Sequence, residues 1–136
     1  MAENRKPKIH LIDDDDIVNM INEDIIKESR LFSKVYVSDN AEDGLRLLVE
    51  KSEEELPDLI LLDLNMPEMS GWEFIEELLI IDKNYPHIKQ VKLAILSTSN
   101  HKGDIIRAAQ FDRVKKYFVK PLTQEKLEEC IRIIEE

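Results

Sequence analysis

The sequence contains a single cysteine and no long apolar run, and each absence excludes a class of protein. One cysteine, Cys130, excludes an internal disulfide framework. The longest apolar runs, such as Leu59–Leu62 and Leu78–Ile81, are too short to cross a bilayer. The opening residues Met1–Lys8 carry charges but lack the apolar core of a signal peptide. We therefore expect a cytoplasmic protein that does not insert into a membrane.

Positive charge is also scarce. The chain has 19 Lys and Arg residues against 29 Asp and Glu residues, a formal net charge of −10, and no basic patch is evident along it. This charge repels nucleic acid and anionic lipid, so neither is an expected partner. Apolar residues make up 43% of the 136 residues, which is too much for a disordered chain and fits one globular domain.

Apolar runs of strand length alternate with longer segments of helical spacing. The five runs are Ile9–Ile12, Val35–Val37, Leu59–Leu62, Leu93–Leu96 and Tyr117–Val119. The third and fourth runs are apolar at every position, which is typical of parallel strands covered by helices on both faces. The alternation predicts an α/β fold: a doubly wound sheet of five parallel strands between two layers of helices.

Five helices are expected between and after these strands. The first spans Asp16–Ser29, with Ile17, Ile21 and Ile25 in one apolar row beside Val18. The others are expected at 41–49, from Gly71 onward, near Asp104–Phe111 and from Thr123 onward. Their apolar positions are Ala41, Leu45 and Leu48; Phe74, Ile75, Leu78 and Leu79; and Leu127, Cys130, Ile131 and Ile134. The segments Lys51–Pro57 and Asp82–Lys92 are predicted to be surface connections.

Acidic residues follow two of the predicted strands directly. Asp13, Asp14, Asp15 and Asp16 follow the first strand, and Asp63 follows the third. Asp15 and Asp16 are expected in the first turn of the following helix, where the helix dipole favours carboxylates. Asp13, Asp14 and Asp63 should instead face one crevice. Two carboxylates about 4 Å apart repel by about 4 kcal/mol at an effective dielectric constant of about 20. We therefore expect a cation among them.

Oxygen ligands alone favour a hard cation, and a few carboxylates with a carbonyl and waters suit octahedral Mg²⁺. An EF-hand Ca²⁺ loop counted from Asp13 would place Val18 where glycine is needed, so that motif is excluded. The three histidines, His10, His87 and His101, show no paired spacing, which gives a zinc site little support.

Two further polar residues end strands of the predicted sheet. Ser97 ends the fourth run, and Lys120 ends the fifth run immediately before Pro121. Alone, each is most often an ordinary turn residue or surface charge. Together they would supply a hydroxyl and an ammonium group near Asp63, as handling a phosphoryl group at a carboxylate requires. Pro121 restricts the backbone of Lys120 to extended geometry and permits a cis bond.

Four segments together resemble a known family. They are Ile12-Asp13-Asp14-Asp15, the run from Leu61 to Gly71 that contains Asp63-Leu64-Asn65-Met66-Pro67, Ile95-Leu96-Ser97, and Tyr117-Phe118-Val119-Lys120-Pro121. From about Lys8 onward the chain resembles the receiver domain of two-component response regulators, particularly the stand-alone, chemotaxis-regulator-like kind. The resemblance implies a flavodoxin-like sheet of order 2-1-3-4-5. It also implies a single receiver domain over residues 1–136, with its core from about residue 7 and no output domain.

The resemblance assigns roles to the acidic residues. It implies that Asp63 is the phosphoacceptor, which takes a phosphoryl group from a histidine kinase, a histidine phosphotransfer protein or a small phosphodonor. Asp13, Asp14, Asp63 and the backbone carbonyl of Asn65 would then hold Mg²⁺. The protein would be a signalling phosphoacceptor rather than an enzyme.

The resemblance also implies a switch. Ser97 and Lys120 would bind phosphoryl oxygens, and the movement of Ser97 with the rotamer of Tyr117 would report phosphorylation. The output would be contact with an unidentified downstream protein, through the fourth helix, fifth strand and fifth helix.

The chain departs from the family pattern at several positions. Thr98 follows Ser97 where alanine is frequent, and its larger side chain is expected to crowd the path of Tyr117. Arg113-Val114 replaces a common Gly-Ala pair, Gly44 lies inside the second helix, and the connection at Asn84–His87 is longer than in compact receivers.

Two alternatives remain open on the sequence. A Mg²⁺-dependent phosphohydrolase with an aspartyl nucleophile needs a second acid two residues after it, where this chain has Asn65. A receiver fold that only binds other proteins would not need the acids, the hydroxyl and the lysine, which are all present.

Overall fold

The computed structural model describes residues 5–136, so residues 1–4 of the expected domain lie outside the described residues. The strands are β1 (Lys8–Ile12), β2 (Lys34–Ser38), β3 (Leu59–Leu62), β4 (Lys92–Ser97) and β5 (Val114–Val119). The α-helices are α1 (Asp16–Ser29), α2 (Ala41–Glu50), α3 (Gly71–Asn84), α4 (Lys102–Ala109) and α5 (Gln124–Glu135). Two short 3₁₀ helices, η2 (Glu53–Glu55) and η3 (Pro86–Gln90), complete the described chain.

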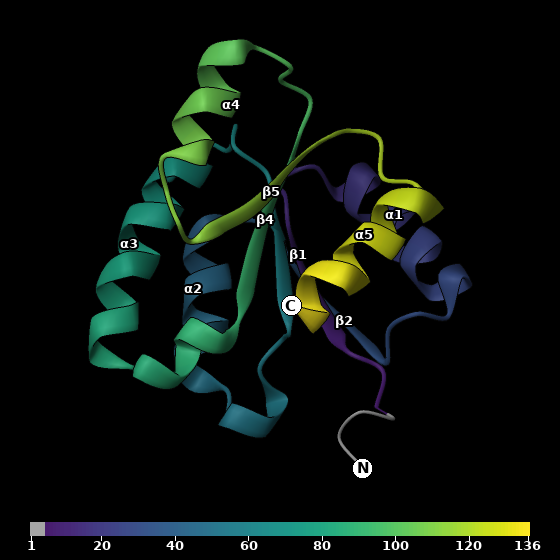
Figure 1. Cartoon of the computed structure of the whole chain (residues 1–136), viewed down its shortest axis with the longest axis horizontal. Helices are drawn as coiled ribbons and strands as arrows, with labels where there is room; N and C mark the ends of the chain where they lie inside the picture. The colour runs from purple at the N-terminus through teal and green to yellow at the C-terminus, as the bar shows by residue number, and fades with distance from the viewer. Residues whose placement is uncertain (1–4) are drawn as a thin grey trace.

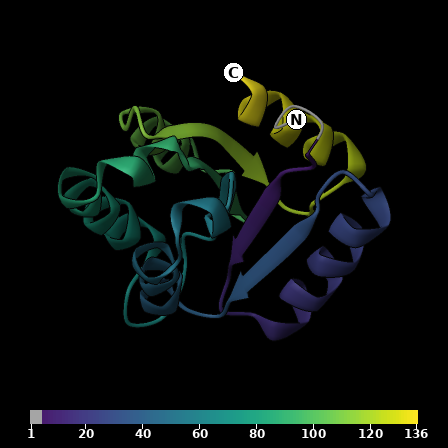
Figure 2. The same cartoon turned by 90° about the horizontal axis from the view of Figure 1, so that it is seen from below.

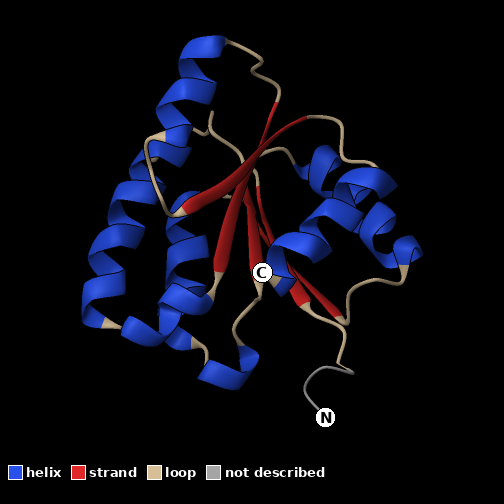
Figure 3. Cartoon of the chain, viewed as in Figure 1, coloured by secondary structure: helices blue, strands red, loops and turns tan. Residues whose placement is uncertain are grey.

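All five strands are parallel and lie in the order β2-β1-β3-β4-β5, with β2 and β5 outermost. Helices α2, α3 and α4 cover one face of the sheet, and α1 and α5 cover the other (Figures 1 and 3). Figure 2 shows the same three layers from below. The predicted doubly wound sheet and its strand order are confirmed.

The alternation of side chains along each strand divides the core in two. Ile12, Ile60, Leu62, Leu93 and Ile95 pack on the face covered by α2, α3 and α4. Ile9, Leu11, Leu59, Leu61 and Leu96 pack on the face covered by α1 and α5. Because β1, β3 and β4 are buried on both faces, their ends are fixed in position, and the side chains that follow them are fixed as well.

The predicted apolar row of α1 was wrong. Ile17 and Ile21 are 68% and 53% exposed, whereas Asn19, Asn22 and Ile26 are buried against the sheet. The rotation has a local cause, because the amide of Asn19 donates a hydrogen bond to the backbone carbonyl of Asp13, the residue that follows β1. The helix therefore presents amides to the protein and aliphatic side chains to the surface over its first two turns.

Gly44 allows α2 to pack closely on β1. A Cβ atom at this position would lie 2.6 Å from Cδ1 of Ile12, which is closer than real contacts permit. The glycine that the sequence marks as unfavourable for helix propensity thus has a packing reason. In α3, Phe74, Ile75 and Leu78 are buried as expected, but Leu79 is exposed.

The two predicted surface connections are partly buried. Leu56 and Pro57 are buried after η2, and Ile88 and Val91 are buried in and after η3. Helix α3 also extends to Asn84, further than its apolar pattern indicates. The fourth helix begins and ends earlier than predicted, at Lys102–Ala109. No helix in the described part of the chain is both long and apolar enough to cross a membrane.

Candidate functional site

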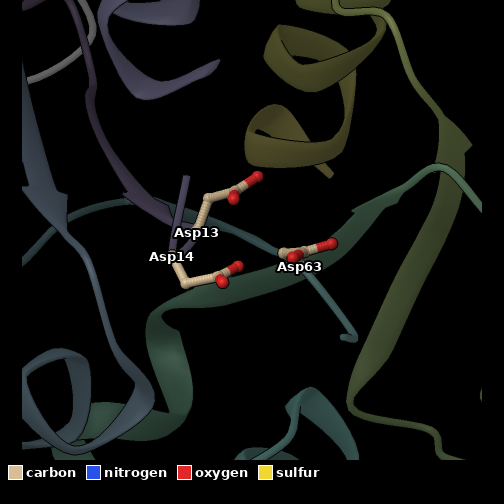
Figure 4. Close-up of side chains that lie close together, drawn as sticks. All are labelled: Asp13, Asp14 and Asp63. Atoms are coloured by element: carbon tan, nitrogen blue, oxygen red, sulfur yellow. The ribbon is translucent and has the colours of Figure 1, made fainter. Parts of the chain in front are cut away.

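Asp13, Asp14 and Asp63 meet at the carboxyl edge of the sheet. β1 and β3 pair with Ile12 opposite Leu62, and the backbone N–H of Asp63 donates to the carbonyl of Ile12 at 2.9 Å. The residues that follow these strands are therefore neighbours. One carboxylate oxygen from each of the three aspartates lies within 4.8 Å of the others, and Figure 4 shows the three carboxyl groups clustered together. The predicted convergence of these acids is confirmed.

The environment of the cluster disfavours so much negative charge. Asp13 and Asp63 are buried, and Asp14 is exposed. Burial raises the pKa of Asp63 to about 6, and the Asp13 carboxylate acts in the same direction, while Lys120 partly opposes both. Nearby positive charge stabilises the ionised form of a buried carboxylate that lies next to a second one. The site is therefore built to attract a cation.

Lys120 supplies one positive charge from the end of β5. Its Nζ lies 2.6 Å from Oδ2 of Asp13 and 3.7 Å from Oδ1 of Asp63. Burial alone would lower the pKa of Lys120, but the hydrogen bond to Asp13 and the charge of Asp63 outweigh it and raise that pKa. The backbone N–H of Lys120 donates to the carbonyl of Ser97 at 2.8 Å, and the Lys120–Pro121 bond is cis.

Asp13 is held through its backbone as well as its side chain. Its N–H donates to the carbonyl of Ser38 at 3.1 Å, and its carbonyl accepts from Nδ2 of Asn19 at 2.8 Å. Its Oδ1 accepts from the N–H of Asp15 at 3.0 Å. Asp15 caps α1, because its side chain accepts hydrogen bonds from the backbone N–H groups of Ile17 and Val18. This agrees with the predicted place of Asp15 at the start of the helix. Asn19 was missed, since one amide in a helix gives no sequence signal.

The loop after Asp63 makes a close turn that only glycine allows. The N–H of Gly71 donates to the carbonyl of Leu64 at 2.8 Å. A Cβ atom on Gly71 would lie 2.5 Å from the carbonyl oxygen of Asp63 and 2.7 Å from Cα of Leu64. Ser70 and Glu73 form a reciprocal capping box that starts α3 at this point. Asn65, within the loop, is exposed.

A second group of polar residues joins the ends of β4 and β5 to α4. Ser97 is fully buried, and its hydroxyl oxygen accepts from the N–H of Ser99 at 3.1 Å. The Ser99 hydroxyl donates to Oδ2 of Asp104 at 2.5 Å, and its carbonyl accepts from the Tyr117 hydroxyl at 2.8 Å. Thr98 is exposed. Asp104 was not among the predicted site residues, because its contact depends on the fold of the loop.

The donor set fits a hard divalent cation. Asp13, Asp14 and Asp63 offer only oxygen, and no sulfur or imidazole is among the groups that converge there within the described chain. Oxygen-only ligands at an open edge are the environment that Mg²⁺ takes in proteins, where it keeps several waters. Together these carboxylates could hold a divalent ion.

Comparisons with known proteins agree with this geometry. Residues 9–132 match the family model of the response regulator receiver domain. The chain is 27% identical to "Response regulator Rcp1" of Synechocystis sp., over 98% of this chain and 90% of that protein. It is 29% identical to "Chemotaxis protein CheY" of Thermotoga maritima, over 91% and 93% of the two chains.

Among solved structures, a two-component response regulator from Cytophaga hutchinsonii is similar with a TM-score of 0.85 and 28% identity, over 96% of this chain and 98% of that one. Receiver domains of this family take a phosphoryl group in signalling rather than turn over a substrate, which disfavours the phosphohydrolase alternative. With its acidic cluster and its match over nearly the whole described chain, this protein belongs to the response regulator receiver domain family and is a phosphoacceptor of two-component signalling.

Proposed function

We propose that Asp63 is the residue that accepts the phosphoryl group. The observation that carries the proposal is the convergence of Asp13, Asp14 and Lys120 on this one carboxylate at the end of the central strand β3. Both side-chain oxygens of Asp13 already accept hydrogen bonds, from Asp15 and Lys120. Of the two buried acids, Asp63 lies farther from the ammonium group of Lys120, at 3.7 Å, than Asp13 does. Its carboxylate is therefore the better placed of the two to act as a nucleophile.

Asp13, Asp14, Asp63 and the backbone carbonyl of Asn65 would hold Mg²⁺. When bound, the ion supplies positive charge that offsets both the carboxylates and the oxygens of an incoming phosphoryl group. The all-oxygen donor set and the raised pKa of Asp63 support this assignment.

The chain's own groups account for the remaining chemistry. A carboxylate oxygen of Asp63 attacks phosphorus, and the bond from phosphorus to the donor breaks as the acyl phosphate forms. Lys120 donates from Nζ to one phosphoryl oxygen, and the Ser97 hydroxyl donates to another. Charge spreads over these oxygens during transfer, so preorganised donors stabilise the transition state. Lys120 already lies between Asp13 and Asp63, which supports this role.

The contacts around Ser99 provide a route from the site to the surface. If Ser97 moves toward the phosphoryl group, it takes with it the Ser99 N–H that donates to its hydroxyl. The carbonyl of Ser99 is bound by Tyr117 in β5, and its hydroxyl is bound to Asp104 in α4. To shift the protein from almost entirely inactive to almost entirely active, phosphorylation must favour the active conformation by about 5.5 kcal/mol. The output is a contact between α4, β5 and α5 and a downstream protein.

A histidine kinase or a histidine phosphotransfer protein is the proposed phosphodonor, and an apolar surface beside the site supports a protein donor. Ile17, Met20 and Ile21 are exposed on α1, shortly after the acidic residues that follow β1. Apolar patches of this kind mark protein contacts. A receiver that takes phosphate only from small molecules would not need them.

The test is incubation of the protein with acetyl phosphate and Mg²⁺, followed by intact mass spectrometry. The wild type should gain one phosphoryl group that hydroxylamine removes. Asp63→Asn and wild type without Mg²⁺ should gain none. Asp58→Asn is the matched control, because Asp58 lies just before the same strand at its opposite end and should not affect uptake.

Two other results would redirect the assignment. If the wild type takes no phosphoryl group from acetyl phosphate or phosphoramidate, the protein is a receiver fold that acts only by binding. If it continuously releases inorganic phosphate from varied phosphate monoesters, it is a hydrolase.

A further inference from the structure

Asn19 is a buried amide with an unusual pattern of contacts. It is 4% exposed on α1, and its Nδ2 donates to the backbone carbonyl of Asp13 at 2.8 Å. Its Oδ1 is buried and has no hydrogen-bond partner among residues 5–136. Buried polar atoms without partners are rare and costly, so each one calls for a reason. Of the two polar atoms of this side chain, only Nδ2 makes a hydrogen bond, and its acceptor is the backbone of a residue in the acidic cluster.

The contact fixes the backbone at the point where two acids leave the sheet. The carbonyl of Asp13 belongs to the peptide group that joins Asp13 to Asp14. On its other side, the Asp13 N–H is bound to the carbonyl of Ser38 at 3.1 Å. With both backbone groups held, the backbone conformation at Asp13 is fixed before any ligand arrives. The hydrogen bond from Asn19 thus holds the peptide group from which both Asp13 and Asp14 extend.

We propose that Asn19 is a positioning residue for the divalent ion site. It holds the peptide between Asp13 and Asp14 so that both carboxylates face Asp63. The proposal rests on the proposed function, because it takes these three acids to be the ligands of Mg²⁺. Asn19 does not touch the ion and acts through the backbone of Asp13.

The packing of α1 argues against a purely structural role. A leucine of similar size would bury apolar surface at this position and leave no amide oxygen without a partner. The same helix exposes Ile17, Met20 and Ile21, so aliphatic side chains are not lacking nearby. The amide is buried here although its Oδ1 has no partner among residues 5–136. What the amide adds is the hydrogen bond to Asp13.

Asn19→Leu and Asn22→Leu form a matched pair for the test. Asn22 is the same residue type on the same helix, is buried to 6% exposure, and lies one turn further along, without a hydrogen bond to Asp13. The dissociation constant for Mg²⁺ is measured by isothermal titration calorimetry. The free energy of unfolding is measured by urea titration in EDTA, where metal binding does not contribute.

We expect Asn19→Leu to weaken Mg²⁺ binding at least tenfold, which is more than any fall in its unfolding free energy in EDTA accounts for, because the variant also leaves the Asp13 carbonyl without this donor. Asn22→Leu should bind Mg²⁺ like the wild type. The rate of phosphoryl uptake from acetyl phosphate should likewise be lower in Asn19→Leu than in Asn22→Leu and the wild type. Asn19→Leu should be slow at low Mg²⁺ and should approach the wild-type rate at saturating Mg²⁺. Asn19→Ala provides a second variant with no added bulk, and it should lose Mg²⁺ affinity to a similar extent.

Three outcomes distinguish the proposals. If both Asn19 variants bind Mg²⁺ within threefold of the wild type, the positioning role is overturned and the proposed function stands. If Mg²⁺ affinity falls only in proportion to lost stability, and equally in Asn22→Leu, the effect is structural and the positioning role is again overturned. If the wild type itself neither binds Mg²⁺ nor takes a phosphoryl group, the proposed function fails.

Discussion

Arg113, which immediately precedes β5, and Asp82, in the last turn of α3, form a buried two-point ion pair. Nε of Arg113 lies 2.8 Å from Oδ2 of Asp82, and Nη2 lies 3.3 Å from Oδ1. Arg113 also donates to the carbonyls of Ile88, at 3.0 Å, and of Val91. One side chain thus joins β5, α3 and the segment around η3, which makes the longer connection after α3 an ordered part of the domain.

Arg113→Met should destabilise the protein strongly. The substitution leaves Asp82 buried without its partner, and breaking a buried pair on one side costs about 3–5 kcal/mol. Arg46→Met is the control, because Arg46 and Asp43 form an exposed pair worth about 1 kcal/mol or less. Urea unfolding measures both, and the double variant Arg113→Met/Asp82→Leu should recover most of the loss. Equal effects of Arg113→Met and Arg46→Met would contradict this account.

Gly71→Ala should destabilise the protein and slow phosphoryl uptake. The added methyl would press on the backbone of Asp63 and Leu64, which cannot yield as a flexible side chain can. Overpacking of this kind costs about 1–3 kcal/mol. Gly103→Ala is the comparison, because a Cβ there meets no atom within 4 Å and should stabilise α4 by up to about 1 kcal/mol. Thermal unfolding and acetyl phosphate uptake check both effects, and normal uptake by Gly71→Ala would refute the first.

His10 should make stability depend on pH. Burial lowers the pKa of His10 from its ordinary 6.5 to about 4, while its Nε2 lies 2.8 Å from the hydroxyl of Ser38. Between these two values the unfolded chain binds a proton at position 10 that the folded chain does not. The free energy of unfolding therefore falls as pH decreases from 6.5 to 4, by about 3 kcal/mol in total from this group.

His10→Gln removes this titration and should flatten the stability curve between pH 4 and 6.5 relative to the wild type. His101→Gln is the control, because His101 is exposed, and its curve should parallel that of the wild type. Other titrating groups are common to the three proteins and cancel in the comparison. Urea titrations at several pH values give the slopes, and parallel curves for His10→Gln and wild type would show that burial of His10 carries no such effect.

Helix α4 should exchange its amide hydrogens faster than α5. Ala108 is the buried residue of α4, and Ile106 is 59% exposed, whereas α5 buries Leu127, Cys130 and Ile133. Segments with few buried contacts open at low free-energy cost. Hydrogen exchange followed by mass spectrometry measures the difference. Equal protection of the two helices would mean that α4 is held more firmly than its burial indicates.

Contacts in the last turn of α4 and just after it link this helix to the start of α3. The rings of Trp72 and Phe111 are stacked with centroids 6.4 Å apart, and the guanidinium carbon of Arg107 lies 4.2 Å from the centroid of Trp72. Phe111→Ala should therefore raise the exchange rate of α4 further, while α5 stays unchanged. If α4 exchanges equally in both proteins, this stack does not hold the helix.

The fold could be predicted because its signals are local and repeated. Continuous apolar runs identified the buried strands, and acids placed directly after Ile12 and Leu62 predicted the shared edge of the sheet. Parallel strands bring their carboxyl ends together whatever the connecting helices contain. That geometry made the cluster of Asp13, Asp14 and Asp63 predictable from sequence position alone.

The rest depended on single side-chain contacts. The exposed row of α1 was predicted to be buried, because periodicity counts aliphatic residues and cannot register an amide that binds the Asp13 carbonyl. Arg113 looked like a departure from the family pattern, and its partner Asp82 lay in a segment interpreted as surface. Ser99 and Asp104 meet only because the loop between β4 and α4 folds back. Such pairings have no period and no fixed spacing.

The outermost positions of β2 and β5 have a consequence for how copies of the protein can associate. Each strand has one side without a neighbouring strand, where a second polypeptide could add by backbone pairing. Lys34 lies exposed on β2, and Lys115 and Lys116 lie exposed on β5. A strand of a second copy that paired with either edge would have to remove water from these ammonium groups. The lysines therefore disfavour edge-to-edge pairing between sheets. Contacts with other proteins are left to the helices that cover the two faces of the sheet.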